Sequence, residues 1–301
     1  MSRTLSLAYA GEVTESDVTV APITAADALA TARFFNENLN PKVSTSAWLC
    51  LIDPPFSSDV PNRGFQLMQG RRIVGAYAAV YSVREIAGAK VTVGNLAAFC
   101  VLEEFRAHSL RLIRPLLRQK GIEFTDLSPS GNVVALNTRL GFSTLDTATT
   151  LVANLPALHR RGTLVSCDPM TIESALRGTD AAVYRDHRNA PAARHLVVQR
   201  NGEYAYLLYR KDRRKGLQLF ATPLYVGGER RVLESAWGNV ASHLLLAHGL
   251  PATLAERRVL GFTPRGLGKQ LTQPRVKMFR STLLDADDID YLYSELTLVS
   301  W

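Results

Sequence analysis

The sequence contains few residues that could cross-link the chain or hold a metal ion. Its three cysteines, Cys50, Cys100 and Cys167, lie far apart and form no CxxC pair. An odd number of scattered cysteines argues against a disulfide framework and against a zinc site, and it fits a reducing cytoplasm. The six histidines show no HxxxH or HxH spacing. We therefore expect no metal site and a cytoplasmic protein.

Long apolar runs are also missing. No stretch of the sequence approaches the roughly 20 apolar residues that a helix needs to cross a bilayer. The first 17 residues lack the long apolar segment of a secretory signal. These absences predict a soluble protein without a membrane span.

Acidic residues are outnumbered by basic ones. The chain carries 35 Lys and Arg against 27 Asp and Glu, which gives a net charge of +8. This excess favours anionic partners, and CoA, nucleic acid and acidic membrane surfaces all meet that condition. A hydrophobic content of 47% is ordinary for a globular protein with a proper core. The length of 301 residues fits two domains.

Apolar periodicity and turn residues divide the first half of the chain into strands and helices. Thr24 caps the first helix and Pro41 ends it, whereas Gly70 marks a hairpin turn. The apolar, weakly alternating strands suit a central sheet that is covered on both faces. The expected elements are strand 16–24, helix 25–40, loop 42–64, strands 64–70, 73–86 and 90–102, helix 106–120, strand 122–128, helix 131–140 and strand 142–155.

The second half has its own pattern of elements. A polar stretch after Pro156 is typical of a linker, and Asn201-Gly202 between two apolar runs predicts a hairpin. The C-terminal segment 285–301 is expected to pack against the body of the protein through its apolar residues. The expected elements are linker 157–168, helix 169–189, strands 195–212 and 216–228, helix 229–249 and strand 253–262.

The stretch 91–142 resembles the core of the GNAT superfamily of acyl-CoA-dependent N-acyltransferases. In it, an apolar strand enters a basic turn and a helix, and a second strand–helix unit ends in Leu140-Gly141-Phe142. The order of elements up to residue 155 is that of a complete GNAT domain. The resemblance implies an α/β fold with a mixed central sheet and an acyl-CoA-binding domain at 1–156. Because a second Leu-Gly-Phe occurs at 260–262, we expect a diverged GNAT-like domain at 157–301, in tandem with the first.

The resemblance also indicates where CoA binds. In the family the pantetheine arm pairs with the central strand, and a Q/R-x-x-G-x-G/A turn at a helix N-terminus binds the pyrophosphate. Arg106 fits the first position of this turn, but Ser109 and Arg111 replace both glycines, and Pro115 interrupts the helix. The basic residues could instead form a solvated helix face, and Asn132 could be a simple helix cap. The implied CoA-binding residues are Phe99, Cys100, Val101, Arg106, Ala107, His108, Ser109, Leu110, Arg111 and Asn132.

Three residues are candidates for proton transfer. The family has a tyrosine that protonates the leaving CoA thiolate; its position is Asn137 when counted back from Gly141-Phe142 and Arg139 when counted forward from Asn132. Ser128, Ser130 or water are alternatives for that role. An amine acceptor must also lose a proton, and Glu103 or Glu104 at the end of the central strand could accept it. These two carboxylates could equally serve only the helix dipole and pair with basic neighbours.

The resemblance therefore implies an N-acyltransferase, most simply an acetyltransferase, with acetyl-CoA or another acyl-CoA as co-substrate and a small amine as acceptor. Direct attack is expected, because no Cys–His or Ser–His–Asp arrangement indicates a covalent intermediate. The missing glycines and tyrosine support an alternative, a GNAT-like protein that binds a ligand or partner without catalysis. RNA binding is a third hypothesis, but the interleaved aromatic motifs of RNA-binding modules are absent. The second domain would support the first, shape the acceptor pocket or mediate a homodimer.

Overall fold

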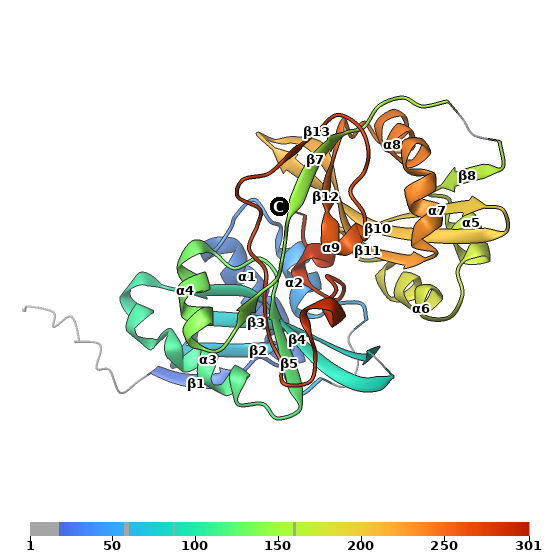
Figure 1. Cartoon of the computed structure of the whole chain (residues 1–301). Coiled ribbons are helices and arrows are strands. Elements are labelled where there is room, and N and C mark those ends of the chain that lie inside the picture. Colours follow the sequence, from blue (N-terminus) through green and yellow to red (C-terminus); the bar gives the residue numbers. More distant parts are fainter. Residues whose placement is uncertain (1–17, 57–59, 87, 159–160, 301) are drawn as a thin grey trace, which may run out of the picture.

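The computed structural model describes residues 18–56, 60–86, 88–158 and 161–300, and it contains two mixed seven-stranded sheets (Figure 1). The first sheet has the strand order β1-β2-β3-β4-β5-β14-β6, and the second has the order β13-β7-β12-β11-β10-β9-β8. The mixed α/β class expected from the sequence is confirmed, and the two sheets are consistent with the expected two-part arrangement. No helix in the described part of the chain is long and apolar enough to cross a membrane.

Up to residue 140 the first half follows the predicted order of elements, with an added helix α2 and with the predicted helix 106–120 divided into a 3₁₀ helix and α3. Residues 42–64 were predicted as a loop, but they contain a helix that Ser44 caps by accepting a hydrogen bond from the Ala47 amide at 3.2 Å. The helix forms because Trp48, Leu51 and Ile52 bury one apolar side. The elements are β1 Val18–Pro22, α1 Ala28–Asn38, α2 Thr45–Ile52, β2 Gly64–Gln69, β3 Arg72–Ile86, β4 Ala89–Val101, a 3₁₀ helix Glu103–His108, α3 Leu110–Leu117, β5 Ile122–Asp126, α4 Gly131–Arg139, β6 Ser143–Thr144 and β7 Thr149–Ala153.

The second half departs from the prediction at its helices, at its linker and at the predicted strand 253–262, which is a strand only as far as Glu256 and then forms helix α9. The single helices expected at 169–189 and 229–249 are each divided in two, and the predicted linker contains strand β8. The hairpin at Asn201-Gly202 is confirmed, and both residues have the positive φ values, 52° and 82°, that such a turn requires. The elements are β8 Thr163–Ser166, α5 Pro169–Ala175, α6 Gly178–His187, β9 Arg194–Arg200, β10 Glu203–Arg214, β11 Leu217–Gly228, α7 Arg230–Ser235, α8 Trp237–Leu246, β12 Ala252–Glu256, α9 Arg257–Leu260, β13 Gly268–Gln270, β14 Met278–Arg280 and α10 Glu295–Leu298.

The two halves exchange a strand. The stretch 142–155 was predicted as the final strand of the first half, but it divides into β6 and β7, and β7 lies antiparallel between β12 and β13 of the second sheet. Strand β14 returns from the second half and lies antiparallel between β5 and β6 of the first. Figure 1 shows β7 passing from one half to the other. Each sheet is therefore completed by a strand from the other half of the chain.

The second half repeats the topology of the first. Hairpin β3–β4 and parallel strand β5 correspond to hairpin β10–β11 and parallel strand β12. In both halves a helix follows and ends at the glycine of the Leu-Gly-Phe sequence, where Gly141 and Gly261 have φ values of 87° and 79°. These left-handed positions favour glycine after a helix. The repeated tripeptide thus marks the same structural position twice.

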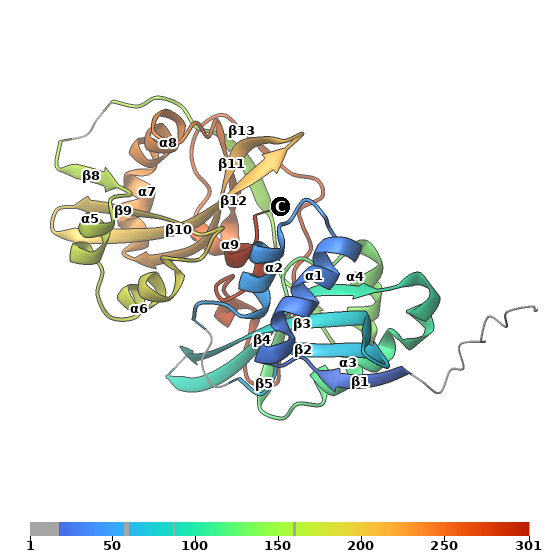
Figure 2. The ribbon, with the colours of Figure 1, turned by 180° about the vertical axis from the view of Figure 1, so that it is seen from behind.

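Helices cover both faces of the first sheet. Figures 1 and 2 show α1 and α2 on one face and α3 and α4 on the opposite face. The core on the α3 side includes Leu112, Leu116 and Phe124. The core on the α1 and α2 side continues without interruption into the second half, where it includes Leu207 and Leu296. A shared apolar core and the exchanged strands therefore join the halves firmly.

Candidate functional site

A divergence between two parallel strands opens the centre of the first sheet. Strands β4 and β5 pair from Thr92 and Ile122 to Asn95 and Thr125, and no further pairing between them occurs in the described residues. A bulge lies at this point, because Ala78 of β3 faces Ala98 whereas Ala79 faces Leu96, which leaves Ala97 as an extra residue. Bulges bend a strand and redirect its side chains. Residues 96–101 of β4 consequently present an edge that β5 does not cover.

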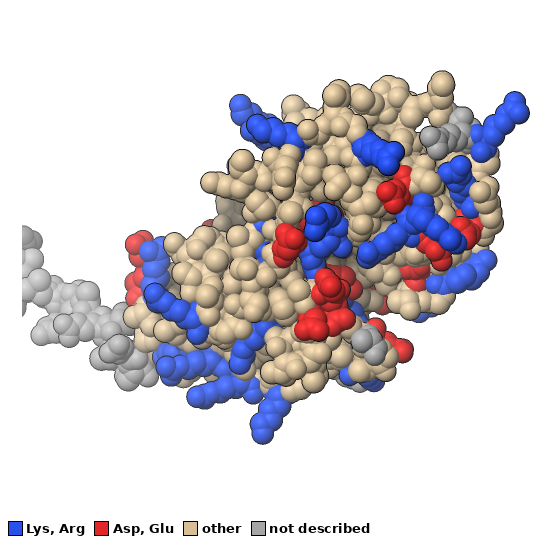
Figure 3. Space-filling model, in the orientation of Figure 1, with Lys and Arg blue, Asp and Glu red and all other residues tan. Residues whose placement is uncertain are grey.

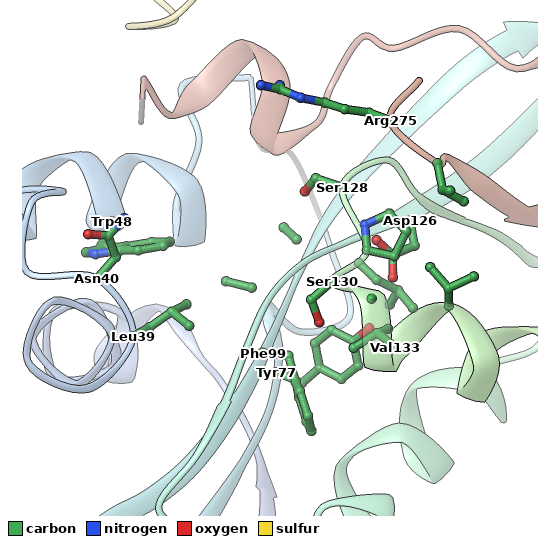
Figure 4. A pocket seen from close by; sticks show the side chains of 17 residues that line it. Leu39, Asn40, Trp48, Tyr77, Phe99, Asp126, Ser128, Ser130, Val133 and Arg275 are labelled. Carbon is green, nitrogen blue, oxygen red and sulfur yellow. The ribbon is translucent and has the colours of Figure 1, made fainter. Parts of the chain in front are cut away.

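A cavity of about 560 Å³ lies at this divergence, a size typical of small-molecule sites (Figure 4). Leu39 and Trp48 form one wall from the helical side, and Tyr77 and Phe99 contribute from β3 and β4. The loop that connects β5 to α4 forms the opposite wall. Arg275, from the segment that precedes β14, also lines the cavity, so both halves of the chain contribute to it.

Asp126 is the central ionisable group of the cavity. It is the last residue of β5 and is only 4% exposed, and its Oδ2 accepts a hydrogen bond of 2.8 Å from Nδ2 of Asn137 on α4. Burial raises the pKa of Asp126 to about 7, and the charge of Glu295 adds to this rise, whereas hydrogen bonds from Asn137 and from the Ser128 amide oppose it. A carboxylate with a pKa near neutrality is well matched to proton transfer at physiological pH.

Glu295, from the C-terminal helix α10, lies behind the same wall. It is completely buried, and its Oε1 accepts a hydrogen bond of 2.6 Å from the Ser128 hydroxyl, while its Oε2 accepts one from Nδ2 of Asn95. Burial raises its pKa, and the hydrogen bonds from Ser128 and Asn95 oppose the rise. The C-terminal segment was expected only to pack against the body. It does pack, through Leu296, but it also brings a second carboxyl group close to Asp126.

Tyr77 supplies a phenol to the cavity from β3. Its pKa is raised well above 10 by burial and by the charges of Asp126 and Glu295, so the hydroxyl stays protonated and can donate a hydrogen bond. Ser128 and Ser130 also line the cavity, as Figure 4 shows. The sequence interpretation included the two serines but missed Tyr77, Asp126 and Glu295. Two features of the sequence could have indicated the carboxylates. Asp126 stands at the end of an apolar strand, and Glu295 stands within an apolar C-terminal segment.

The carboxylates predicted as general bases lie elsewhere. Glu103 and Glu104 begin the exposed 3₁₀ helix after β4, and neither is among the residues that line the cavity. Glu103 approaches Arg106 at 3.6 Å, and Glu104 approaches Arg72 at 3.8 Å. These contacts correspond to the alternative in which the two acids serve the helix and its basic neighbours.

The predicted phosphate turn, residues 106–111, is divided between the end of the 3₁₀ helix and the start of α3. One of its amides is used within the turn, since Ser109 donates to the Arg106 carbonyl at 3.1 Å. The Ser109 hydroxyl also donates to the Arg106 carbonyl. The Arg111 guanidinium donates to the Val18 carbonyl at 2.8 Å and so ties α3 to strand β1. Arg106 is exposed and remains accessible to an anion.

The other predicted site residues have mixed positions. Phe99 lines the cavity, Cys100 donates weakly to the Asn38 carbonyl at 3.5 Å, and Val101 ends β4. Ala107 and His108 lie in the 3₁₀ helix, Leu110 begins α3, and Asn132 is exposed in the first turn of α4. Asn137 is buried and donates to Asp126, so it acts on the cavity through that carboxylate.

Comparison with solved structures identifies the fold. No protein-family model and no curated protein sequence match the chain. Solved structures do match, and the chain has the fold of the GCN5-related N-acetyltransferases (GNATs), as the sequence resemblance predicted.

Three of these structures illustrate the match. A GCN5-related N-acetyltransferase from Anabaena variabilis has a TM-score of 0.57 at 10% identity, and the match covers 87% of this chain and 72% of the Anabaena chain. A GCN5-related N-acetyltransferase from Kribbella flavida has a TM-score of 0.54 at 15% identity, and the match covers 87% of this chain and 70% of the Kribbella chain. A Pyrococcus horikoshii protein assigned as an acetyltransferase has a TM-score of 0.53 at 14% identity, and the match covers 95% of this chain and 99% of the Pyrococcus chain. At such identities the likeness concerns the fold alone.

Proposed function

We propose that this protein is an acyl-CoA-dependent N-acyltransferase that transfers an acyl group, most simply acetyl, to a small amine by direct attack. The observation that carries the proposal is the cavity at the divergence of β4 and β5, with the buried carboxyl group of Asp126 in its wall. The cavity joins an open strand edge to a group that can accept a proton, and the GNAT fold supports this combination.

The uncovered edge of β4 is the proposed seat of the pantetheine arm. An extended amide-containing chain can form hydrogen bonds with residues 96–101 in place of β5, as a peptide does when it adds to a sheet edge. The phosphates would then lie towards residues 106–111. Arg106 is exposed at this turn and Arg114 is exposed on α3, and Figure 3 shows basic side chains over the end of the molecule that carries α3 and β1. Charge would thus replace part of the contact that the missing turn glycines give in the family.

Asp126 is the proposed general base. With a pKa of about 7 it is largely ionised slightly above neutrality and can take a proton from the amine during its attack on the thioester. Asn137 fixes the orientation of Asp126 and keeps its pKa from rising further. The Tyr77 hydroxyl, which faces the same cavity, is the proposed donor to the departing thiolate. In this mechanism Glu295 positions Ser128 and tunes Asp126 through its charge.

A second candidate function is ligand binding without acyl transfer. Two observations favour it, namely the hydrogen bond from the Ser109 amide to the Arg106 carbonyl within the phosphate turn and the engagement of Arg111 with the Val18 carbonyl. Both reduce the number of donors that face a pyrophosphate.

Release of free CoA from acetyl-CoA separates the two functions. The assay mixes the protein with acetyl-CoA and a panel of small amines and follows the new thiol with a chromogenic reagent. We expect amine-dependent CoA release that Asp126→Asn reduces by about 10²- to 10⁴-fold, the usual contribution of a general base. Tight binding of acetyl-CoA with no release for any amine would favour the non-catalytic function.

A further inference from the structure

Three potential metal ligands converge in the second half of the chain, away from the cavity between β4 and β5. The Cys167 Sγ lies 3.5 Å from Nε2 of His243 and 3.3 Å from Nε2 of His248, and all three ligand atoms lie within 4.8 Å of one another. All three side chains are half-buried. We propose that Cys167, His243 and His248 bind Zn²⁺, with a solvent molecule as the fourth ligand.

The distances agree with tetrahedral zinc geometry. A Zn–S bond of about 2.3 Å and a Zn–N bond of about 2.05 Å at the tetrahedral angle place sulfur and nitrogen about 3.6 Å apart. The two sulfur–nitrogen distances of 3.5 and 3.3 Å lie close to this value. The same distances also permit weak hydrogen bonds between the Cys167 thiol and the two imidazoles. A zinc ion bound by all three residues, however, requires that both Nε2 atoms approach the Cys167 sulfur. Zinc binds cysteine and histidine in this way, and three protein ligands leave one position open.

The backbone holds each of the three residues in place. Cys167 lies between β8 and α5, where the Asp168 side chain caps α5 by accepting a hydrogen bond of 2.8 Å from the Thr171 amide. His243 is in the last turn of α8. His248 follows in a turn that the Gly249 amide closes by donating to the Leu245 carbonyl at 2.9 Å. A zinc ion would therefore cross-link the β8–α5 connection to the end of α8 without a rearrangement of the backbone.

Two neighbouring positive charges oppose cation binding, Lys211 and, at His248, Arg194. The Lys211 ammonium group of β10 lies close enough to act electrostatically on both Cys167 and His248. A deprotonated Cys167 offsets this charge, which is the form in which cysteine binds zinc. Substitution Lys211→Gln should therefore strengthen zinc binding, and this result would distinguish the ion at this site from one bound elsewhere.

Titration of the chelator-treated, tag-free full chain with Zn²⁺ and Co²⁺ tests the proposal. We expect one ion per chain and a near-ultraviolet thiolate-to-cobalt absorption band. Cys167→Ser should lose the band, and both Cys167→Ser and His243→Gln should weaken zinc binding at least about 100-fold, whereas the matched control Cys50→Ser should retain the band and the affinity. Zinc at 100 times its dissociation constant should also raise the melting temperature by about 5 °C in the wild type and not in Cys167→Ser.

Three results would overturn the proposal. One is the absence of stoichiometric zinc binding at micromolar concentration, and another is cobalt binding without the thiolate band. The third is zinc binding by Cys167→Ser that equals that of Cys50→Ser. Circular dichroism of each variant establishes that a lost band reflects a lost ligand in a folded chain.

Discussion

Replacement of Asp126 by asparagine should stabilise the folded protein above neutral pH while it removes the proposed base. The substitution keeps the shape of the side chain and an oxygen that can accept the hydrogen bond from Asn137. It removes a negative charge that is buried beside Glu295. The buried negative charge destabilises the folded wild type only when the carboxyl group is ionised. The effect of the substitution on stability therefore depends on pH.

The size of the effect follows from the pKa shift. The pKa of Asp126 rises from its ordinary value of 3.8 to about 7 in the folded protein. Between these values the folded state binds more protons than the unfolded state, so the wild type loses stability as pH rises towards 7. Each pKa unit corresponds to about 1.4 kcal/mol, so ionisation from pH 5 to pH 8 costs about 3 kcal/mol of folding free energy. The asparagine variant avoids that cost.

Urea denaturation of both proteins at pH 5 and pH 8 measures this difference. We expect the free energy of unfolding of Asp126→Asn, relative to the wild type, to be more favourable at pH 8 than at pH 5 by about 3 kcal/mol. Asp287→Asn, which removes an exposed carboxylate, is the matched control and should show no such difference. A relative stability of Asp126→Asn that does not change with pH would refute the assignment of a raised pKa to this residue.

Three further substitutions probe the site and the fold. Asn137→Ala removes a hydrogen bond that lowers the pKa of Asp126, so the acid limb of the pH–rate profile for CoA release should move to higher pH, whereas exposed Thr138→Ala should leave it in place. Arg106→Ala should weaken acetyl-CoA binding about tenfold, as measured by calorimetry. Arg33→Ala on α1 is the control, and an unchanged affinity of Arg106→Ala for acetyl-CoA would exclude Arg106 from the phosphate site. Arg210→Ala leaves the buried Asp212 without its 3.0 Å partner and should cost about 3 kcal/mol in urea denaturation, against under 1 kcal/mol for exposed Arg214→Ala.

The sequence predicted most of the first sheet because the information there is local. Apolar runs, the hairpin at Gly70 and the glycine after α4 define elements through short-range rules, and these elements formed where expected. The prediction failed for β7 and β14, which are short strands that complete the opposite sheet. No local pattern states which sheet a short strand joins, because pairing depends on partners about 100 or more residues away.

The site illustrates the same limit. Arg106 and Phe99 could be assigned through the family pattern, whereas Glu295 meets Asn95 across 200 residues of sequence. The cluster of Cys167, His243 and His248 was missed for this reason as well, since the cysteine precedes the first histidine by 76 residues and no spacing motif exists. Sequence spacing finds metal ligands on one element, and it does not find ligands that separate elements bring together.

Calorimetric titration of the wild-type protein with acetyl-CoA tests the central claim most directly. The cavity, the uncovered edge of β4 and the basic end of the first half are proposed to form one acyl-CoA site. We predict binding of one acetyl-CoA per chain with a dissociation constant below about 1 mM, in the range of enzyme substrates. Absence of any binding of acetyl-CoA or longer acyl-CoAs at that concentration would contradict the claim.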